Sequence, residues 1–150
     1  MRIAIINGPN LNLLGRREPS IYGTHSMEQV LIDIQRLYPD LYLEYRQSNH
    51  EGDLIDWMQD IGLLSICDER YDGIILNAGG YSHTSVALRD AIACAQLPVV
   101  EVHISDITQR EEFRRVSLLT DVCTYAIIGK GVEGYRQAVE WIMNGMKEIV

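Results

Sequence analysis

Tyrosine, arginine and amide side chains gather near the N-terminus, in a segment that could carry out proton transfer. Residues 7–23 read NGPNLNLLGRREPSIYG and hold three asparagines, two adjacent arginines and Tyr22. A free tyrosine has a pKa near ~10 and is a weak base at neutral pH, but a nearby guanidinium favours the phenolate. Arg17 lies on the same segment and is a candidate source of that charge. Taken alone, the segment is equally consistent with a well-packed surface loop.

Two histidines could supply the complementary proton donor. His83 ends the run NAGGYSH, and His103 follows Glu101 in the run EVHIS. Histidine is suited to protonate a leaving hydroxyl group. Either histidine taken singly is more simply explained as a core residue. Together with a tyrosine base and amide donors, they fit a dehydration next to a carbonyl group.

Other site chemistries lack their sequence signatures. No P-loop and no GxGxxG motif follows the first apolar run, and no serine or cysteine lies in a nucleophile elbow. Carboxylate–histidine clusters with the spacing of metal ligands are absent. Cys67, Cys94 and Cys123 are odd in number and widely spaced, which excludes a disulfide framework. We expect them to be small core residues in a reducing cytoplasm.

Length and composition bound the class of protein. The 150 residues fit a single catalytic domain spanning residues 1–150, and 47% of them are apolar. The formal net charge of −8 disfavours nucleic acid and anionic membrane surfaces as partners. No apolar run approaches the ~18 residues of a membrane span, and no signal peptide is visible. These features predict a cytoplasmic protein.

Alternating strands and helices must position the candidate residues. Short apolar runs predict five strands, at residues 2–6, 41–46, 74–76, 99–102 and 124–128. Apolar residues at helical spacing predict helices after Ser26, at 54–64, at 84–95 and at 132–149. Ser26 is the expected N-cap, with Gln29 as its capping-box partner. Lys147 is expected in the last turn of the final helix.

This order predicts an α/β fold of the flavodoxin-like, doubly wound type, with a five-stranded parallel sheet in the strand order 2-1-3-4-5. In such sheets ligands bind outside the carboxyl ends of the strands. The polar residues that follow the predicted strands are Asn10, Arg17, Tyr22, Asn49, His50, Asn77, His83, His103, Ser105, Arg110 and Arg114. Clustered arginines in an otherwise acidic chain indicate a site for a small anionic molecule.

Three motifs resemble type II 3-dehydroquinate dehydratase. They are NGPNLNLLGRREPSIYG, NAGGYSHTSVALRDA, and EVHIS followed by REEFR. The resemblance covers nearly the whole chain, in order and at matching spacing. It implies a flavodoxin-like fold and the cofactor-free, metal-free dehydration of 3-dehydroquinate to 3-dehydroshikimate. The elimination of water would be trans, would pass through an enolate, and would belong to the shikimate pathway of aromatic amino acid biosynthesis.

The resemblance also implies catalytic roles. Tyr22 would be the base that removes a proton from C2, with Arg17 activating it. Asn10 would hold a water near the developing enolate oxygen. His103 would be the acid that protonates the departing C1 hydroxyl, with Glu101 beside it.

The remaining implied roles concern binding and assembly. The residues that would hold the substrate carboxylate and ring hydroxyls are Asn77, Ile104, Ser105, His83 and Arg114. Asp90 lies about two turns into the helix at 84–95 and points away from its own strand edge, so the resemblance implies that it reaches a neighbouring subunit's site. The implied assembly is a homo-oligomer, a dodecamer built as a tetramer of trimers. A plain surface position is the alternative for Asp90.

The chain departs from the commoner family pattern at several positions, namely Ala78, Gly80, Asp106, Thr108, Arg115 and Val116. None of these positions has an assigned role in the chemistry. Three other functions share the fold class: a response-regulator receiver, a flavin-binding electron carrier and a non-enzymatic scaffold. Asn7 and Asn77 stand where a receiver needs its acidic residues, and the first loop lacks the hydroxyl-rich phosphate site of a flavin carrier.

Overall fold

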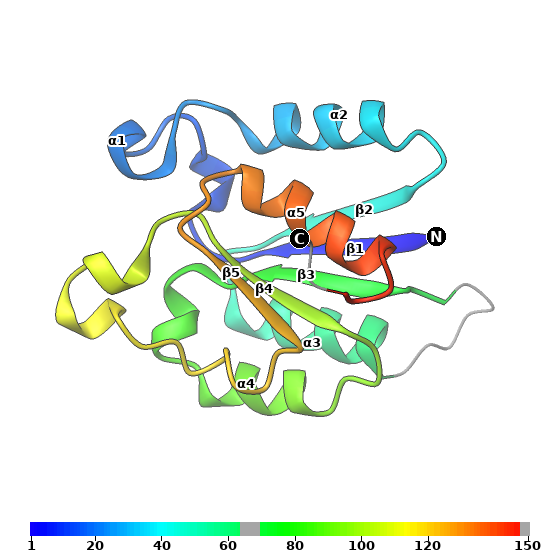
Figure 1. Cartoon of the computed structure of the whole chain (residues 1–150). Coiled ribbons are helices and arrows are strands. Elements are labelled where there is room, and N and C mark those ends of the chain that lie inside the picture. Colours follow the sequence, from blue (N-terminus) through cyan, green and yellow to red (C-terminus); the bar gives the residue numbers. More distant parts are fainter. Residues whose placement is uncertain (64–69, 148–150) are drawn as a thin grey trace.

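A parallel β-sheet lies between two layers of helices in the computed structural model, which describes residues 1–63 and 70–147 (Figure 1). The strands of these described residues are β1 (Arg2–Asn7), β2 (Tyr42–Gln47), β3 (Gly73–Asn77), β4 (Val99–His103) and β5 (Tyr125–Ile128). Their order in the sheet is β2-β1-β3-β4-β5, and every pairing is parallel. The predicted fold class and strand order are therefore confirmed.

The helices connect the strands in the manner expected of a doubly wound sheet. The longer ones are α2 (Met27–Leu37), α3 (Glu51–Gly62), α4 (Val86–Ala93) and α5 (Glu133–Met143). Figure 1 shows α2 and α5 on one face of the sheet and α3 and α4 on the other. The hydroxyl of Ser26 accepts a hydrogen bond from the Gln29 amide, so the predicted N-cap of α2 is confirmed.

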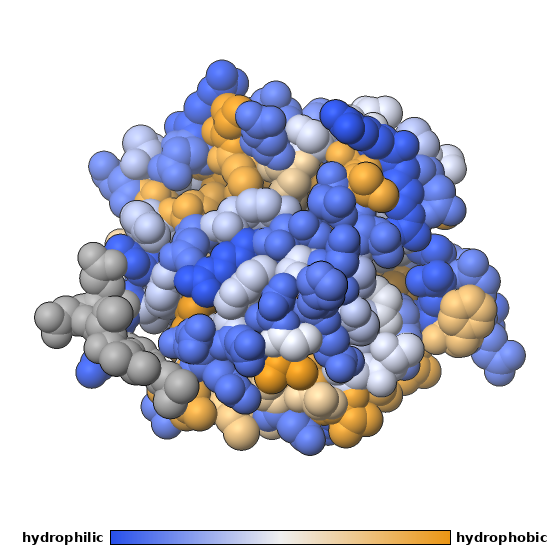
Figure 2. Space-filling model, turned by 180° about the vertical axis from the view of Figure 1, so that it is seen from behind, coloured by the Kyte–Doolittle hydropathy of each residue, from blue (hydrophilic) through white to orange (hydrophobic). Residues whose placement is uncertain are grey.

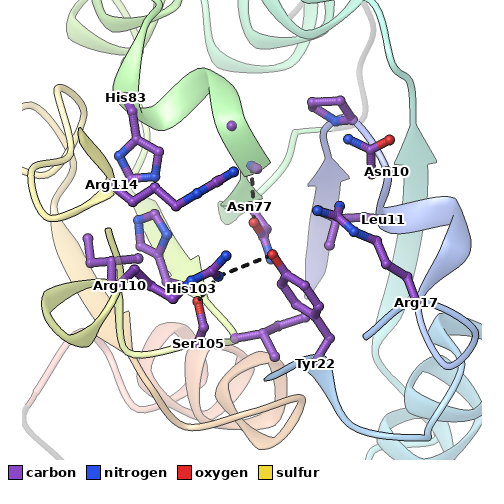
Figure 3. Close-up of a pocket in the computed structure, with 15 residues that line it drawn as sticks. Asn10, Leu11, Arg17, Tyr22, Asn77, His83, His103, Ser105, Arg110 and Arg114 are labelled. Carbon is purple, nitrogen blue, oxygen red and sulfur yellow. Dashed lines mark hydrogen bonds between the residues drawn. The ribbon is translucent and has the colours of Figure 1, made fainter. Parts of the chain in front are cut away.

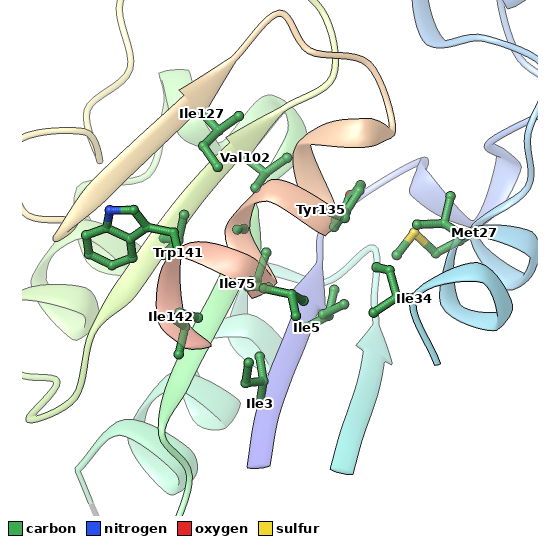
Figure 4. Close-up of a cluster of buried hydrophobic side chains, with 14 of the residues drawn as sticks. Ile3, Ile5, Met27, Ile34, Ile75, Val102, Ile127, Tyr135, Trp141 and Ile142 are labelled. Carbon is green, nitrogen blue, oxygen red and sulfur yellow. The ribbon is translucent and has the colours of Figure 1, made fainter. Parts of the chain in front are cut away.

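The sheet is buried on both faces because its central strands are almost wholly apolar. On the face covered by α2 and α5, the core includes Ile5, Ile34, Ile75 and Trp141 (Figure 4). The opposite face packs Ala4, Ile6, Ile74 and Leu76 against α3 and α4, in a second cluster that includes Leu54, Met58, Leu88 and Ile92. Alternate residues of one strand thus serve two cores, as buried parallel strands require.

The segment 7–23 contains more regular structure than its sequence predicts. It holds the 3-10 turn η1 (Leu11–Leu13) and the one-turn helix α1 (Pro19–Tyr22). Pro19 occupies the first helical position, which suits its fixed φ. Leu11 and Leu14 are buried, so the segment is anchored to the core beside β1.

The last helix ends earlier than predicted, so the expectation for Lys147 is wrong. Helix α5 stops at Met143, and Gly145 and Met146 have φ values of 68° and 65°. Two consecutive left-handed residues cannot continue a right-handed helix. Lys147 therefore follows the helix rather than lying in its last turn. Leu64 and Ile149, which the apolar pattern assigned to helices, lie outside the described residues.

The cysteines do not all lie in the core. Cys94 is exposed, so the prediction for it is wrong, since it caps the end of α4 rather than facing the sheet. Cys123 is partly buried, and burial, with the charges of Glu101 and Asp121, raises the pKa of its thiol to about 12. Such a thiol stays protonated and unreactive at neutral pH. Cys67 lies outside the described residues.

The surface gives no sign of a membrane-crossing element in the part of the chain that the structure describes. None of its helices has both the length and the apolar character needed to cross a bilayer. The face seen in Figure 2 is mainly hydrophilic, with its apolar side chains at separate places.

Candidate active site

A pocket opens at the carboxyl edge of the sheet, where the sequence predicts the ligand site (Figure 3). It brings together nine of the eleven predicted site residues, namely Asn10, Arg17, Tyr22, Asn77, His83, His103, Ile104, Ser105 and Arg114. Glu101 lies behind His103, and Asp90 is exposed on α4, away from this pocket. Asn49 and His50, which also follow a strand, are not among the lining residues.

The loops after β1 and β3 meet backbone to backbone at the floor of the pocket. A Cβ added at Gly8 would lie 2.5 Å from the Ala78 carbonyl oxygen, so only glycine fits there. Gly79 has φ +58°, and a Cβ on it would lie 3.0 Å from the Pro9 carbonyl oxygen. This close approach holds the tyrosine-bearing segment against the loop that carries His83.

Asn10, which precedes the turn η1 in the segment 7–23, has a backbone conformation that few residues adopt. Its φ and ψ are 68° and −2°, in the left-handed region that asparagine tolerates better than most residues. Its backbone N–H donates to the Asn49 side-chain oxygen at 3.0 Å. Asn49, a strand-end residue outside the pocket, therefore supports a residue inside it.

Tyr22 ends helix α1 and extends its hydroxyl into the pocket (Figure 3). The Arg17 guanidinium lies over the Tyr22 ring, 5.0 Å from its centroid, while its Nε pairs with Glu18. The hydroxyl itself accepts a hydrogen bond from Arg110 Nη1 at 3.2 Å. Arg17 thus contacts the ring, and a second guanidinium contacts the oxygen.

Arg110 is the pocket residue that sequence reasoning left without a role. The pocket has two walls, one formed by the segment 7–23 and the other by the end of β4 and the chain that follows it. Arg110 Nη1 also donates to the Ser105 hydroxyl at 3.2 Å, which fixes the guanidinium between these walls. The hydrogen bond to Tyr22 raises the pKa of Arg110 above its ordinary value, with Glu111 and Glu18 contributing. The group therefore stays charged throughout the neutral pH range.

His103 ends β4 and is held by a carboxylate with no exposed surface. Its Nε2 lies 2.6 Å from Glu101 Oε1, and Glu101 is 0% exposed. The hydroxyls of Ser117 and Thr120 also donate to this carboxylate. With Nε2 engaged, Nδ1 is the ring nitrogen left for a ligand.

The charge on Glu101 depends on these donors. Burial alone would raise the pKa of its carboxyl group, but the hydrogen bond and charge of His103, with the two hydroxyls, lower the pKa below its usual value. Glu101 is therefore an ionised acceptor beside the His103 ring. Ser117 and Thr120 carry no sequence signal for this role, because only the folded chain brings them to Glu101.

His83 and Arg114 complete the wall of the pocket that contains His103. His83 Nδ1 lies 2.8 Å from the Val116 carbonyl oxygen, which assigns the proton to Nδ1 and leaves Nε2 for a ligand. The His83 and His103 rings stack with centroids 6.3 Å apart. Arg114 Nε lies 3.3 Å from Glu111 at the rim.

Asn77 lies between the two walls and is only 4% exposed. Its side-chain oxygen accepts a hydrogen bond from the Gly79 amide at 3.2 Å. Its side-chain nitrogen donates to the Tyr135 hydroxyl at 3.0 Å. The amide is therefore held at both ends.

The charge of the pocket is opposite to that of the chain. Three arginines and two histidines are among its described lining residues, and none of those residues is acidic. The chain as a whole has a formal charge of −8. Groups of histidine, cysteine and carboxylate side chains that could hold a metal ion are not found among residues 1–63 and 70–147. The pocket is thus built for an anion that forms several directed hydrogen bonds.

The departures from the commoner family pattern leave this geometry intact. Ala78 replaces a proline of the commoner pattern and has φ −77°, within the range that proline requires. Gly80 replaces an alanine, and a Cβ there would meet nothing within 4 Å. Asp106 caps the 3-10 turn η3 (Ile107–Gln109) by accepting from the Thr108 amide, as an asparagine could. Val116 contributes its carbonyl rather than its exposed side chain.

Comparisons with known proteins agree on one family. The model of the family described as Dehydroquinase class II matches residues 1–143. The chain is 49% identical over 149 residues to a 3-dehydroquinate dehydratase of Halothermothrix orenii, covering 98% of this chain and 97% of the relative. It is 50% identical over 145 residues to the enzyme of the same name from an Exiguobacterium species, covering 96% and 95%.

Solved structures give the same result. The type II dehydroquinase of Butyrivibrio crossotus superimposes with a TM-score of 0.87 at 41% identity, covering 95% of this chain and 97% of that one. The type II dehydroquinase of Propionibacterium acnes gives a TM-score of 0.85 at 36% identity, with coverage of 95% and 96%.

The Arg110–Tyr22 contact predicts an effect on turnover. Arg110→Ala removes the guanidinium that donates to the Tyr22 hydroxyl and to Ser105. We expect turnover at pH 7 to fall by about 10²-fold. Arg16→Ala removes the same charge from an exposed position outside the pocket and should leave turnover unchanged. Equal turnover in the two variants would remove Arg110 from the reaction.

Proposed function

The chain belongs to the class II dehydroquinase family, whose reaction is the cofactor-free dehydration of 3-dehydroquinate in the shikimate pathway, and on that premise we propose how its pocket works. The reaction removes a proton from C2 and a hydroxide from C1 of the ring, so it needs a base and an acid. The product, 3-dehydroshikimate, is a conjugated enone.

The base is Tyr22 in its phenolate form. Arg110 donates a hydrogen bond to its oxygen, and Arg17 lies over its ring, so two cations stabilise the negative charge. Removing the C2 proton leaves an enolate, whose charge develops on the C3 oxygen. Asn10, at the start of the same segment, holds a water against that oxygen, which spreads the charge without a metal ion.

The acid is His103 in its imidazolium form. It protonates the C1 hydroxyl as the C1–O bond breaks, so that water leaves. Glu101 stabilises the imidazolium and turns the ring so that Nδ1 is presented to the ligand. The base and the acid come from opposite walls of the pocket, which supports a trans elimination (Figure 3).

Substrate binding falls to the remaining lining residues. Asn77 and the backbone at Ile104 and Ser105 hold the carboxylate, which the absence of acidic side chains among the described lining residues favours. His83 and Arg114 hold the ring hydroxyls. The single observation that carries the proposal is the Arg110–Tyr22 hydrogen bond, which joins the base to the wall that holds the carboxylate-backed acid.

We also propose that the working unit is a cytoplasmic homo-oligomer, a dodecamer built as a tetramer of trimers, in which Asp90 completes a neighbour's site. Asp90 is exposed on α4 and does not line its own pocket. Val86 on the same helix is 58% exposed, and Phe113 and Val116 near the pocket are 71% and 66% exposed. In the proposed assembly a neighbouring subunit covers these apolar side chains. The same proposal takes residues 1–150 as one catalytic domain.

The assignment of the base is tested by Tyr22→Phe. The substitution keeps the ring and removes the oxygen that takes the proton, so kcat should fall by at least ~10²-fold. The measurement is the ultraviolet absorbance of the enone formed from 3-dehydroquinate. Tyr125→Phe, at the far edge of the sheet, should retain wild-type turnover. Turnover in Tyr22→Phe equal to that of the control would exclude Tyr22 as the base.

The assembly is tested by Asp90→Ala. We expect the native protein to sediment at a multiple of the 17.1 kDa chain mass, and the variant to lose about tenfold or more in kcat/KM, to dissociate, or both. Asp56→Ala removes an exposed aspartate from α3 and should do neither. A fully active native monomer would contradict the proposal.

A further inference from the structure

A buried tyrosine hydroxyl lies directly beneath the pocket, and no step of the proposed reaction uses it. Tyr135 is in the first turn of α5 and is 0% exposed (Figure 4). Its neighbour Gly134 has no Cβ, and one added there would lie 3.3 Å from Val102, so the glycine lets α5 approach the sheet closely. This approach brings the Tyr135 hydroxyl to the carboxyl ends of β1 and β3.

Two asparagines hold this hydroxyl between them. Asn7 and Asn77 end their strands and are direct partners in the β1–β3 register. The Tyr135 hydroxyl donates to Asn7 Oδ1 at 2.9 Å and accepts from Asn77 Nδ2 at 3.0 Å. A fully buried hydroxyl with both a donor and an acceptor partner is satisfied without water.

The direction of these bonds fixes the amide of Asn77. The one proton of the Tyr135 hydroxyl is used on Asn7 Oδ1, so toward Asn77 the hydroxyl can only accept. Asn77 must therefore turn its nitrogen toward Tyr135 and its oxygen toward the Gly79 amide. The amide nitrogen has two hydrogens, and only the second is left for a ligand in the pocket.

Tyr135 keeps its proton under all working conditions. Burial raises the pKa of its hydroxyl strongly, outweighing the two amide hydrogen bonds that lower it. The hydroxyl therefore remains a donor to Asn7 and an acceptor for Asn77 throughout the neutral range.

From this arrangement we infer that Tyr135 is a positioning residue for substrate binding: it holds Asn77 so that an N–H, never a carbonyl oxygen, faces the substrate's carboxylate. A flipped amide would present a lone pair to that anion and repel it. The inference rests on the proposed role of Asn77 in the dehydration of 3-dehydroquinate.

The test is Tyr135→Phe, assayed with 3-dehydroquinate. The carboxylate is present in substrate and transition state alike, so its contacts lower KM and leave kcat almost unchanged. We expect KM to rise about tenfold and kcat to stay within about threefold of wild type. An unchanged KM would overturn the inference, and so would a fall of about tenfold in kcat without a change in KM.

Two further variants separate positioning from general damage to the core. In an Asn77→Ala background, Tyr135→Phe should raise KM by no more than about twofold, because the two residues act through one contact. If the effects of Asn77→Ala and Tyr135→Phe on KM multiply in full in the double variant, the inference is contradicted. Tyr45→Phe removes the partly buried hydroxyl that accepts from Asn7 Nδ2 at 3.5 Å, and should leave KM within about twofold.

Two measurements cover the remaining outcomes. If Tyr135→Phe folds too poorly to assay, Asn7→Ala removes the acceptor for the tyrosine proton instead, and KM should again rise about tenfold; wild-type KM would overturn the inference. The side-chain amide signals of Asn77 in NMR spectra need no turnover, and they should shift in Tyr135→Phe and not in Tyr45→Phe. Native protein that does not dehydrate 3-dehydroquinate would refute the proposed function, whereas unshifted Asn77 signals would refute the positioning role alone.

Discussion

A buried carboxylate on β4 organises the wall of the site that carries His103, the proposed acid. Glu101 has no exposed surface, and a charge in that position is stable only when it is paired and hydrogen-bonded. It accepts hydrogen bonds from His103 on the same strand and from Ser117 and Thr120, which follow β4 in the chain. The segment between His103 and Ser117 carries Arg110 and Arg114 of the pocket, and the carbonyl of Val116 in this segment orients His83.

The opposite wall follows a different physical logic. The segment 7–23 has no buried charge and is held by leucines and by the contact of Gly8 with the backbone at Ala78. Gly15 and Gly23, with φ values of 89° and 80°, bound the part that carries Arg17 and Tyr22. We expect Tyr22 on this segment to close over a bound substrate, while His103 stays on the sheet.

Sequence periodicity was sufficient for the sheet because β1 and β3 contain continuous apolar runs that are buried on both faces. The predicted strands differ from those observed by only one or two residues at their ends. Strand order then placed nine site residues at one edge. The ends of helices were harder to predict from the sequence. The end of α5 depends on the left-handed conformation of Met146, which the spacing of apolar residues does not encode.

The contacts that tune the site were beyond the reach of sequence reasoning. The Arg110–Tyr22 bond joins residues 88 positions apart, and the Tyr135–Asn7 bond joins residues 128 apart. Ser117, Thr120 and Tyr135 are ordinary residue types with no motif of their own. Their roles follow from burial, which favours a hydrogen-bond partner for each polar group that the fold takes out of water.

Turnover of the Glu101→Gln variant tests the proposed acid most directly. The substitution keeps the shape of the side chain but removes the buried charge beside His103. We expect kcat at pH 7 to fall by about 10²-fold, because His103 loses the carboxylate that holds its ring for proton donation. Glu140→Gln, which alters a partly buried carboxylate on α5, should leave kcat unchanged. A Glu101→Gln enzyme with the kcat of the wild type would contradict the role proposed for His103.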